Sequence, residues 1–296
     1  MSKSIDRLKT ILYFVNKTNY PSLNKIINKL IDEGYVTCSE RTVQRDFKSI
    51  RETCLIDVEY DRNKKGYYID EESKKETEEW LSFFELFQTA KVINQTLLKS
   101  AENIEYIDFD RNKQIIQEQL LSGILNATVE RKSVNFEYHN FRKNETTNYF
   151  FQPYLLKQYQ NRWYVFGTIN KDEFRTFALD RMFSLKNTNE KFKSISNKPK
   201  QFFDDVIGMI YSTSDVNDVV LSFSVHQGNY IKTQPLHTSQ KILIDNEEEF
   251  RISLRVRINY ELEEQILKQG EKVRVIEPEE LKTVIKNRLI KALENY

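Results

Sequence analysis

Four side chains between residues 41 and 48 have the types and the spacing needed to read the edges of DNA base pairs. They are Arg41, Gln44, Arg45 and Lys48. In a helix at about 100° per residue, they lie within about 100° of arc on one face. Arginine can bond guanine bidentately and glutamine adenine, each pair contributing about 1–3 kcal/mol of discrimination. A solvated amphipathic helix without a partner has the same pattern, so this segment alone leaves both interpretations open.

The other face of this segment is apolar and would hold the helix, residues 40–53, against a bundle. Its members are Val43, Phe47, Ile50 and Cys54. Ser39 is the expected N-cap of this helix. Two further helices are expected before it, one over residues 4–16 and one that starts after Ser22 and ends at Gly34.

A basic hairpin is expected directly after these helices. Residues 56–60 alternate apolar and polar with period two, and residues 67–69 are typical of a return strand. The turn between them carries Arg62, Lys64 and Lys65. Helices followed by a basic hairpin predict a wing that contacts phosphates, and this order favours DNA binding over the solvated helix.

Residues 39–47 and 60–68 resemble the recognition helix and the wing of DeoR-type winged helix-turn-helix domains, and the resemblance covers residues 1–70. It implies a double-stranded DNA operator as the partner. The residues implied to bind DNA are Ser39, Arg41, Thr42, Gln44, Arg45, Lys48, Arg62, Lys64 and Lys65.

Residues 71–130 are expected to form a helical linker or dimerisation region. The stretch 71–79 is almost wholly charged, and two apolar helices follow it. The residues that mark these helices are Trp80, Phe84, Phe87 and Leu97, then Ile115, Ile116, Leu120, Ile124 and Leu125. Such stripes either form a core or pair two protomers, and the sequence leaves both open.

Residues 131–195 change to a strand-like period. Val134, Phe136 and Tyr138 alternate, and turn signals such as Asn144 and Asn161 separate several short apolar segments. Short strands with turns between them predict a small antiparallel β-barrel.

This block resembles the WYL domain, a small barrel related to Sm and SH3 folds. The resemblance rests on residues 136–138, 153–155, 162–165 and 175–181, although Val165 stands where the family has leucine. It implies a domain that senses nucleic acid or a nucleotide-like ligand.

Five residues are candidates for binding that ligand: Tyr138, His139, Tyr154, Arg175 and Arg181. The two arginines are fixed-charge forks suited to phosphate. The rings can stack on a base, which is worth about 1–3 kcal/mol. Arg181 could instead pair with an acid such as Asp180, and His139 could instead be structural.

Residues 196–296 are expected to form a C-terminal α+β domain. Strands are expected over 219–225, 250–258 and 273–276, a helix over 261–269, and a final helix with Pro278 at its first position. Two segments carry a resemblance to the WYL C-terminal extension, namely residues 235–240 and 273–278. The sequence leaves two roles open for this domain, namely contact between the protomers of a dimer and closure over the effector.

Composition excludes several other classes of protein. Apolar residues make up 39% of the 296-residue chain and charged residues 30%, and no apolar run approaches the roughly 18–20 residues that span a bilayer. The chain is therefore expected to be cytoplasmic. Cys38 and Cys54 form no CxxC pair and the three histidines lie far apart, so no metal site and no cofactor are expected. With no paired acids, no nucleophile motif and only 7 glycines, the chain is not expected to be an enzyme.

The sequence thus predicts an α+β multidomain chain that acts as a homodimeric transcriptional regulator. We expect a repressor whose operator affinity is set by a nucleic-acid-derived or nucleotide-like effector at the WYL domain. From similar proteins, control of a phage-defence locus is implied. The alternatives are an activator that responds to single-stranded DNA after DNA damage, or a non-enzymatic accessory module that binds nucleic acid.

Overall fold

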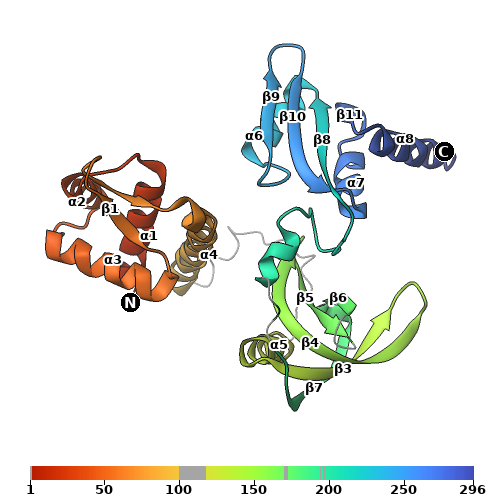
Figure 1. The fold of residues 1–296 in the computed structure, drawn as a ribbon, viewed down its shortest axis with the longest axis horizontal. Coiled ribbons are helices and arrows are strands. Elements are labelled where there is room, and N and C mark those ends of the chain that lie inside the picture. Colours follow the sequence, from red (N-terminus) through yellow and green to blue (C-terminus); the bar gives the residue numbers. More distant parts are fainter. Residues whose placement is uncertain (1, 100–117, 170–172, 194, 196–197) are drawn as a thin grey trace. The chain divides into compact units, whose positions relative to one another are not determined.

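The structure, a computed structural model, describes residues 2–99, 118–169, 173–193, 195 and 198–296 (Figure 1). Its α-helices are α1 (Ser2–Lys17), α2 (Leu23–Asp32), α3 (Glu40–Cys54), α4 (Lys74–Lys99), α5 (Glu118–Glu130), α6 (Val225–Thr233), α7 (Tyr260–Leu267) and α8 (Glu279–Leu293). Its strands are β1 (Val58–Asp61), β2 (Gly66–Ile69), β3 (Lys132–Asn140), β4 (Glu145–Tyr159), β5 (Arg162–Ile169), β6 (Glu173–Ala178), β7 (Met182–Lys191), β8 (Val216–Phe223), β9 (Lys241–Asp245), β10 (Phe250–Arg257) and β11 (Val273–Glu277). Among the described helices, none has the length and the apolar composition needed to cross a membrane.

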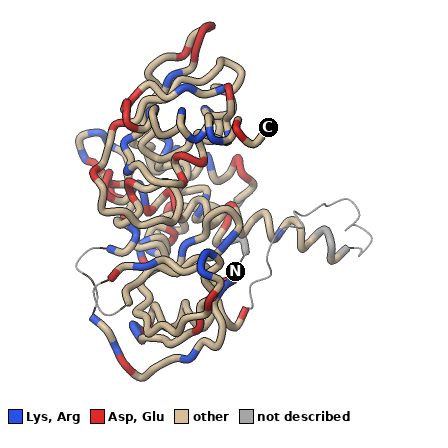
Figure 2. The backbone as a smooth tube through the Cα atoms, turned by 90° about the vertical axis from the view of Figure 1, so that its right-hand side faces the viewer, with Lys and Arg blue, Asp and Glu red and all other residues tan. Residues whose placement is uncertain are grey.

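Charged side chains of both signs are distributed along the backbone. Figure 2 shows Lys and Arg interspersed with Asp and Glu, in keeping with a net charge of only +1. A surface that attracts a polyanion must therefore be built locally, by the placement of a few side chains.

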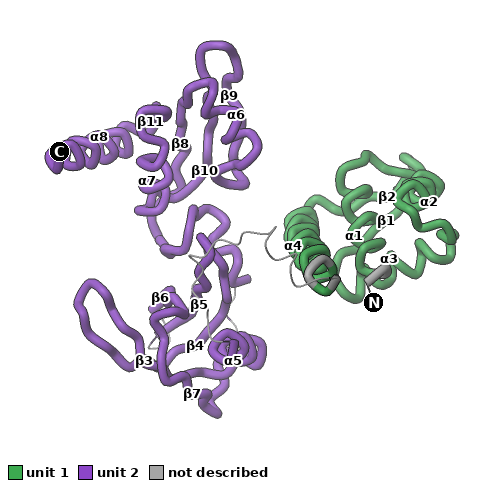
Figure 3. Tube along the Cα trace, turned by 180° about the vertical axis from the view of Figure 1, so that it is seen from behind, with its two compact units in different colours: residues 1–109 green, residues 110–296 purple. Residues whose placement is uncertain are grey.

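The chain divides into two compact units, residues 1–109 and residues 110–296 (Figure 3). The helical stretch that was expected to be one linker is divided between them, with α4 in the first unit and α5 in the second. Ile115 and Ile116 lie outside the described residues.

Unit 1 is built around one apolar core that the first three helices share with the hairpin. The fully buried members of this core are Ile11, Leu12, Ile26, Leu30, Val43, Ile50 and Ile56. β1 and β2 pair antiparallel, with Val58 opposite Ile69 and Asp61 opposite Gly66. The three expected helices and the expected hairpin are therefore present, each within a few residues of its predicted ends.

An ion pair inside unit 1 joins α1 to α3. The guanidinium of Arg7 donates to both carboxylate oxygens of Asp46, and the Nη2 to Oδ1 distance is 2.7 Å. The side chains are only 16% and 3% exposed, respectively. The hydrogen bond to Asp46 raises the pKa of Arg7, so the guanidinium keeps its charge. Asp46 therefore acts with the buried apolar stripe of α3 to fix which face of the helix is turned inward.

α4 completes unit 1 by packing against the other helices. Phe84 is buried in the core, and the indole Nε1 of Trp80 donates to the carbonyl oxygen of Cys54 at 3.0 Å. The ammonium of Lys91 lies 2.8 Å from a carboxylate oxygen of Asp6 on α1. Part of the aromatic stripe of α4 thus belongs to the core of unit 1, which was one of the two roles that the sequence left open for it.

The first part of unit 2 is a five-stranded antiparallel sheet in the order β6-β5-β4-β3-β7. Its apolar face carries Phe136, Phe151 and Phe177, whose rings meet edge to face. α5 covers this face with Ile124 and Ala127, which are both fully buried. Helix α5 therefore belongs to the packing of this sheet.

The closed barrel expected for this block is not found. Among the described strands no pairing joins β6 to β7, which stay the two edges of an open sheet. Alternation with period two is the same in open and closed sheets, so the sequence pattern could not distinguish them. Here α5 covers the apolar face that closure would have buried.

The second part of unit 2 is a four-stranded antiparallel sheet in the order β11-β8-β10-β9, with helices α6, α7 and α8. β8 and β10 are central, and their inward residues are fully buried, among them Val219, Leu221, Ile252 and Val256. The α+β character of this region agrees with the sequence prediction.

Two details of that prediction are wrong. The strand expected over 219–225 ends at Phe223, because Ser224 caps helix α6 by accepting a hydrogen bond from the Gln227 amide. Pro278 precedes α8 as its N-cap instead of occupying the first helical position. The sequence analysis also missed α6 and β9.

A buried carboxylate joins the two parts of unit 2. Glu261 accepts hydrogen bonds from the backbone amides of Met209 and Ile210 at 2.7 and 2.9 Å, and burial raises its pKa. Gly208 has a φ of +91°, and a Cβ there would lie 2.3 Å from the Glu261 carboxyl carbon. Lys157, on β4, donates to the Gly208 carbonyl at 2.9 Å. The connecting segment is thus held from both sides.

The Arg7–Asp46 pair gives a first prediction. Asp46→Ala should lower the unfolding free energy of unit 1 by about 3–5 kcal/mol, because it leaves a guanidinium buried without its counter-charge. Asp57→Ala is the matched control, since it removes the well-exposed partner of Arg51 and should cost at most about 1 kcal/mol.

Urea unfolding of the full chain measures both losses. Trp80 lies in unit 1 and Trp163 in unit 2, and these are the only 2 tryptophans. In a Trp163→Phe background, fluorescence therefore reports on unit 1. Equal, small losses for the two variants would show that the ion pair does not fix α3.

Candidate nucleic-acid interface and ligand site

Helix α3 begins at a capped, polar N-terminus. Ser39 is its N-cap, as predicted, and accepts a hydrogen bond from the Thr42 amide at 3.3 Å. The two hydroxyl oxygens of these residues lie 3.0 Å apart. Ser39 and Thr42 are thus engaged in the cap, and only their remaining hydrogen-bonding capacity faces solvent.

The residues predicted to read bases lie exposed on the first turns of α3. Arg41 and Arg45 form no ion pair with any residue that the structure describes. The amide nitrogen of Gln44 donates to the Tyr67 hydroxyl of β2 at 3.0 Å. Lys48 lies 3.7 Å from Glu52, an exposed pair that contributes little. Two arginines are therefore available for an anionic partner, and Gln44 is oriented by the hairpin.

The hairpin turn is ordered by one aspartate. Asp61 Oδ1 accepts from the amides of Asn63 and Lys64 at 2.8 and 2.9 Å. Arg62, Lys64 and Lys65 are all exposed at this turn. Their side chains extend from a turn whose backbone is fixed.

The hairpin also packs closely against the segment before α2. A Cβ at Gly66 would lie 2.0 Å from the Tyr20 carbonyl oxygen, so only glycine fits there. The ammonium of Lys64 lies 3.8 Å from the centre of the Tyr20 ring. Of the three hairpin cations, Lys64 therefore has a contact within unit 1 that a phosphate would compete with.

A second group of predicted residues meets in unit 2, at the end of β3. The Arg181 guanidinium carbon lies 4.4 Å from the centre of the Phe141 ring, and the His139 ring centre lies 5.5 Å from it. Tyr138 packs edge to face on Phe177 at 4.8 Å, and burial raises its pKa. Three of the five expected ligand residues, Tyr138, His139 and Arg181, are thus placed near Phe141 or the strand that leads to it.

Arg181 has unused hydrogen-bonding capacity in this place. Its Nε is buried without a partner among the described residues, as is Oδ1 of Asp180. The ion pair of Asp180 is formed with Arg162, at 3.7 Å. Arg181 therefore does not form the simple ion pair with Asp180 that the sequence left open as an alternative.

The other two predicted ligand residues lie elsewhere. Arg175 is exposed on β6 and pairs with Glu173 two positions away. Tyr154 packs against Phe192, with ring centres 5.1 Å apart, in a separate aromatic cluster. The five residues therefore do not form one site.

Sequence reasoning missed several residues that shape these surfaces. Arg7, Asp46 and Tyr67 orient α3 and its glutamine, and Phe141 lies between His139 and Arg181. Of these residues, only Asp46 could have been noticed in the sequence, because its charge falls next to the apolar stripe of α3. The others act through contacts between segments far apart in the chain.

Two protein families match the two sheets of unit 2. The WYL domain family matches residues 119–187, which include α5 and most of the five-stranded sheet. The WCX domain family matches residues 215–293, the four-stranded sheet with its helices.

The chain thus contains a WYL domain followed by a WCX domain. The resemblance to the WYL domain and its C-terminal extension is thereby confirmed. The WYL match begins at residue 119, so it includes α5, which the sequence pattern places in the linker.

A structure of proteasome accessory factor B/C (PafBC) of Arthrobacter aurescens is 17% identical, with a TM-score of 0.34 over 99% of this chain and 47% of that chain. The WYL-domain protein thus spans about half the length of that structure. A CRISPR Cas-related protein is 11% identical, with a TM-score of 0.38 over 99% of this chain and 85% of that chain. No curated protein matches the chain in sequence.

Proposed function

We propose that this WYL-domain protein is a DNA-binding transcriptional regulator whose unit 1 is a winged helix-turn-helix. The observation that carries the proposal is the division of α3 into two faces. Asp46 is turned inward to Arg7, while Arg41 and Arg45 are exposed and unpaired among the described residues. A helix with this division can enter a major groove, with its N-terminal turns toward the bases.

The hairpin supplies the phosphate contacts in this proposal. Its exposed cations, Arg62, Lys64 and Lys65, follow α3 directly in the chain. The other contacts proposed are Ser39, Thr42, Gln44 and Lys48 on α3. Contacts to phosphate fix the position of the protein, and contacts to base edges give the specificity.

A homodimer would bind a palindromic operator, with its two recognition helices about 34–36 Å apart. An exposed apolar stripe on α4 supports this part of the proposal. Phe83, Leu86 and Phe87 are 53%, 68% and 40% exposed, and Ala90 continues the helical spacing. Such a stripe at spacings of three and four residues is suited to pairing with a second copy of the same helix.

The WYL domain would hold an effector beside Arg181. An unpartnered buried Nε, the Phe141 ring and His139 together offer a cation, a stacking face and a hydrogen-bonding group. This set suits a nucleotide-like ligand. Because Tyr154 and Arg175 lie elsewhere, we leave them out of the proposed effector site.

We further propose that the protein is a repressor that releases its operator when the effector binds. From the family resemblance, the locus proposed is one for phage defence. A reporter under the native operator distinguishes repression from activation, since deletion of the regulator raises the signal in the first case and lowers it in the second.

The proposal that α3 contacts bases and the hairpin contacts phosphates is testable once an operator has been selected from random duplexes. Arg45→Ala should lower discrimination at one base pair by about 1–3 kcal/mol. Arg62→Ala and Lys64→Ala should weaken binding to all sequences alike and lower the salt slope by about one. Fluorescence anisotropy at several salt concentrations measures both effects. Lys291→Ala, in unit 2, is the charge-matched control, and equal, sequence-blind losses from all substitutions would refute the recognition-helix assignment.

The effector site predicts a separation of two functions. A short single-stranded oligodeoxynucleotide should change the operator affinity of the wild type by a coupling of about 1–3 kcal/mol. Arg181→Ala should abolish this response and leave the operator affinity without effector unchanged. Arg175→Ala is the matched control and should respond as the wild type does. A response that survives in Arg181→Ala, with thermal unfolding unchanged, would contradict the assignment.

The α4 stripe predicts the oligomeric state. Leu86→Glu places a charge in the proposed interface and should convert the dimer to a monomer and weaken operator binding. Gln95→Glu adds the same charge to α4, about 130° from the centre of the stripe, and should leave the dimer intact. Light scattering on the eluted proteins measures the mass. A wild type that is monomeric, or an effect of both variants alike, would remove the stripe from the proposal.

A further inference from the structure

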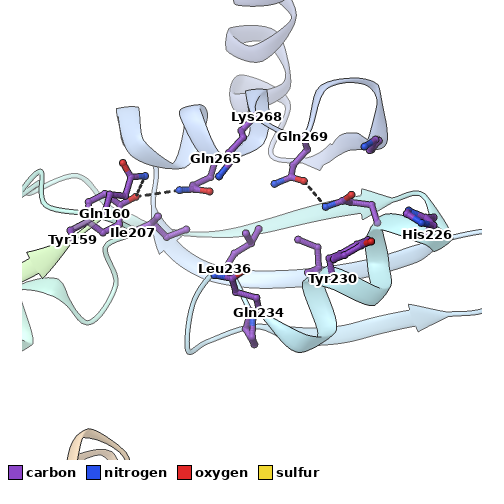
Figure 4. Close-up of a pocket in the computed structure, with 14 residues that line it drawn as sticks. Tyr159, Gln160, Ile207, His226, Tyr230, Gln234, Leu236, Gln265, Lys268 and Gln269 are labelled. Carbon is purple, nitrogen blue, oxygen red and sulfur yellow. Dashed lines mark hydrogen bonds between the residues drawn. The ribbon is translucent and has the colours of Figure 1, made fainter. Parts of the chain in front are cut away.

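A second pocket lies within unit 2, away from Arg181. It has a volume of about 780 Å³, within the range of small-molecule sites. Figure 4 shows Gln265, Lys268 and Gln269 on one side of it, with Tyr230 and His226 on the other. The turn after β4 closes one end through Tyr159 and Gln160. The lining residues are Tyr159, Gln160, Ile207, His226, Gln227, Tyr230, Ile231, Gln234, Pro235, Leu236, Gln265, Lys268, Gln269 and Lys272.

The charge of the pocket wall is entirely positive. Lys268 and Lys272 line it, and no aspartate or glutamate is among the lining residues. Within the described part of the chain, neither lysine forms an ion pair. Glu261, on the same helix as Gln265, is not among the lining residues and accepts hydrogen bonds from the backbone amides of Met209 and Ile210. The wall therefore favours an anion.

Carboxamides supply most of the hydrogen-bonding groups. Gln227 donates to Gln269 at 2.9 Å. Gln265 and Gln160 each donate to the Tyr159 hydroxyl at 3.3 Å. Each carboxamide offers two donors and an acceptor, so these contacts leave further donors and acceptors for a ligand. Carboxamides match the mixed donor and acceptor edge of a nucleobase.

Two rings give the pocket an aromatic side. Tyr230 is 58% exposed, and its ring centre lies 5.5 Å from that of His226 on the same helix. An exposed tyrosine ring next to a histidine offers a face on which a planar ring can stack. At the other end burial raises the pKa of Tyr159, so its phenol keeps its proton as a further donor.

We propose that this pocket binds a nucleotide, with the phosphate at Lys268 and Lys272 and the base against Tyr230 within reach of the carboxamides. Two unpaired lysines, a wall free of acids and an exposed ring across the pocket are the features that carry the proposal. It does not depend on the effector site at Arg181 or on DNA binding by unit 1. The nucleotide could be free or part of a single strand, since both present the same chemistry.

Isothermal titration of the full chain tests the proposal. The probes are adenosine monophosphate, adenosine, inorganic phosphate and a short single-stranded oligodeoxynucleotide. Adenosine monophosphate or the oligonucleotide should bind at least about tenfold more tightly than adenosine or phosphate. The double variant Lys268→Ala, Lys272→Ala and the single variant Tyr230→Ala should each weaken that binding about tenfold or more.

Controls separate this pocket from the other proposed sites. Lys291→Ala removes an exposed lysine of α8 outside the pocket and should not change the affinity for any probe. Because the proposed effector site at Arg181 would bind similar probes, the titrations are repeated in an Arg181→Ala background, where the binding that depends on Lys268 and Lys272 should persist. Binding of the mononucleotide identifies a free ligand, and lysine-dependent binding of the oligonucleotide alone identifies a strand. Absence of binding, binding that both lysine substitutions leave within about twofold, or equal affinity for phosphate alone would overturn the proposal.

Discussion

The buried pair between Arg7 and Asp46 determines how the rest of unit 1 can act. α3 buries an apolar stripe and carries acids and bases on the rest of its surface, so rotation of the helix about its axis would place different charges outward. Together with that stripe, one carboxylate that is 3% exposed and held by two donors removes this freedom. When Asp46 is turned inward, Arg41 and Arg45 face solvent, and the Tyr67 hydroxyl can accept a hydrogen bond from the amide nitrogen of Gln44. The exposed face is therefore a consequence of an interaction on the opposite side of the helix.

Unit 2 is organised around a comparable constraint at the junction of its two sheets. Glu261 binds the backbone of the connecting segment from the WCX side, and Lys157 binds it from the WYL side. Gly208 is required between them, because any side chain there would meet the Glu261 carboxylate. The pocket lined by Tyr159 and Lys268 lies at this same junction, so its shape depends on how firmly the segment is held.

The local features of unit 1 could be predicted from the sequence because they depend on neighbouring residues. Ser39 caps the helix that follows it, and Gly34, with a φ of +90°, ends the preceding one. The buried stripe of α3 and the cations of the hairpin turn follow from the period of the pattern. Each of these is a signal contained within about fifteen residues.

The features that could not be predicted depend on distant contacts. Strand β7 is mostly exposed and carries no alternation of apolar residues, so no pattern marked it. Closure of the sheet depends on pairing between its edges, and α5 takes the face that closure would have buried. Likewise the meeting of Phe141 with Arg181 joins residues forty positions apart, and nothing near either of them in the chain indicates it.

The central claim is that α3 and the hairpin contact duplex DNA. Photo-cross-linking of the full chain to a selected operator that carries iodouracil, followed by mass spectrometry of the peptides, tests it most directly. We predict cross-links within residues 39–48 and 62–65 that unlabelled operator abolishes by competition. Cross-links confined to residues 118–296, or none that competes away, would contradict the claim.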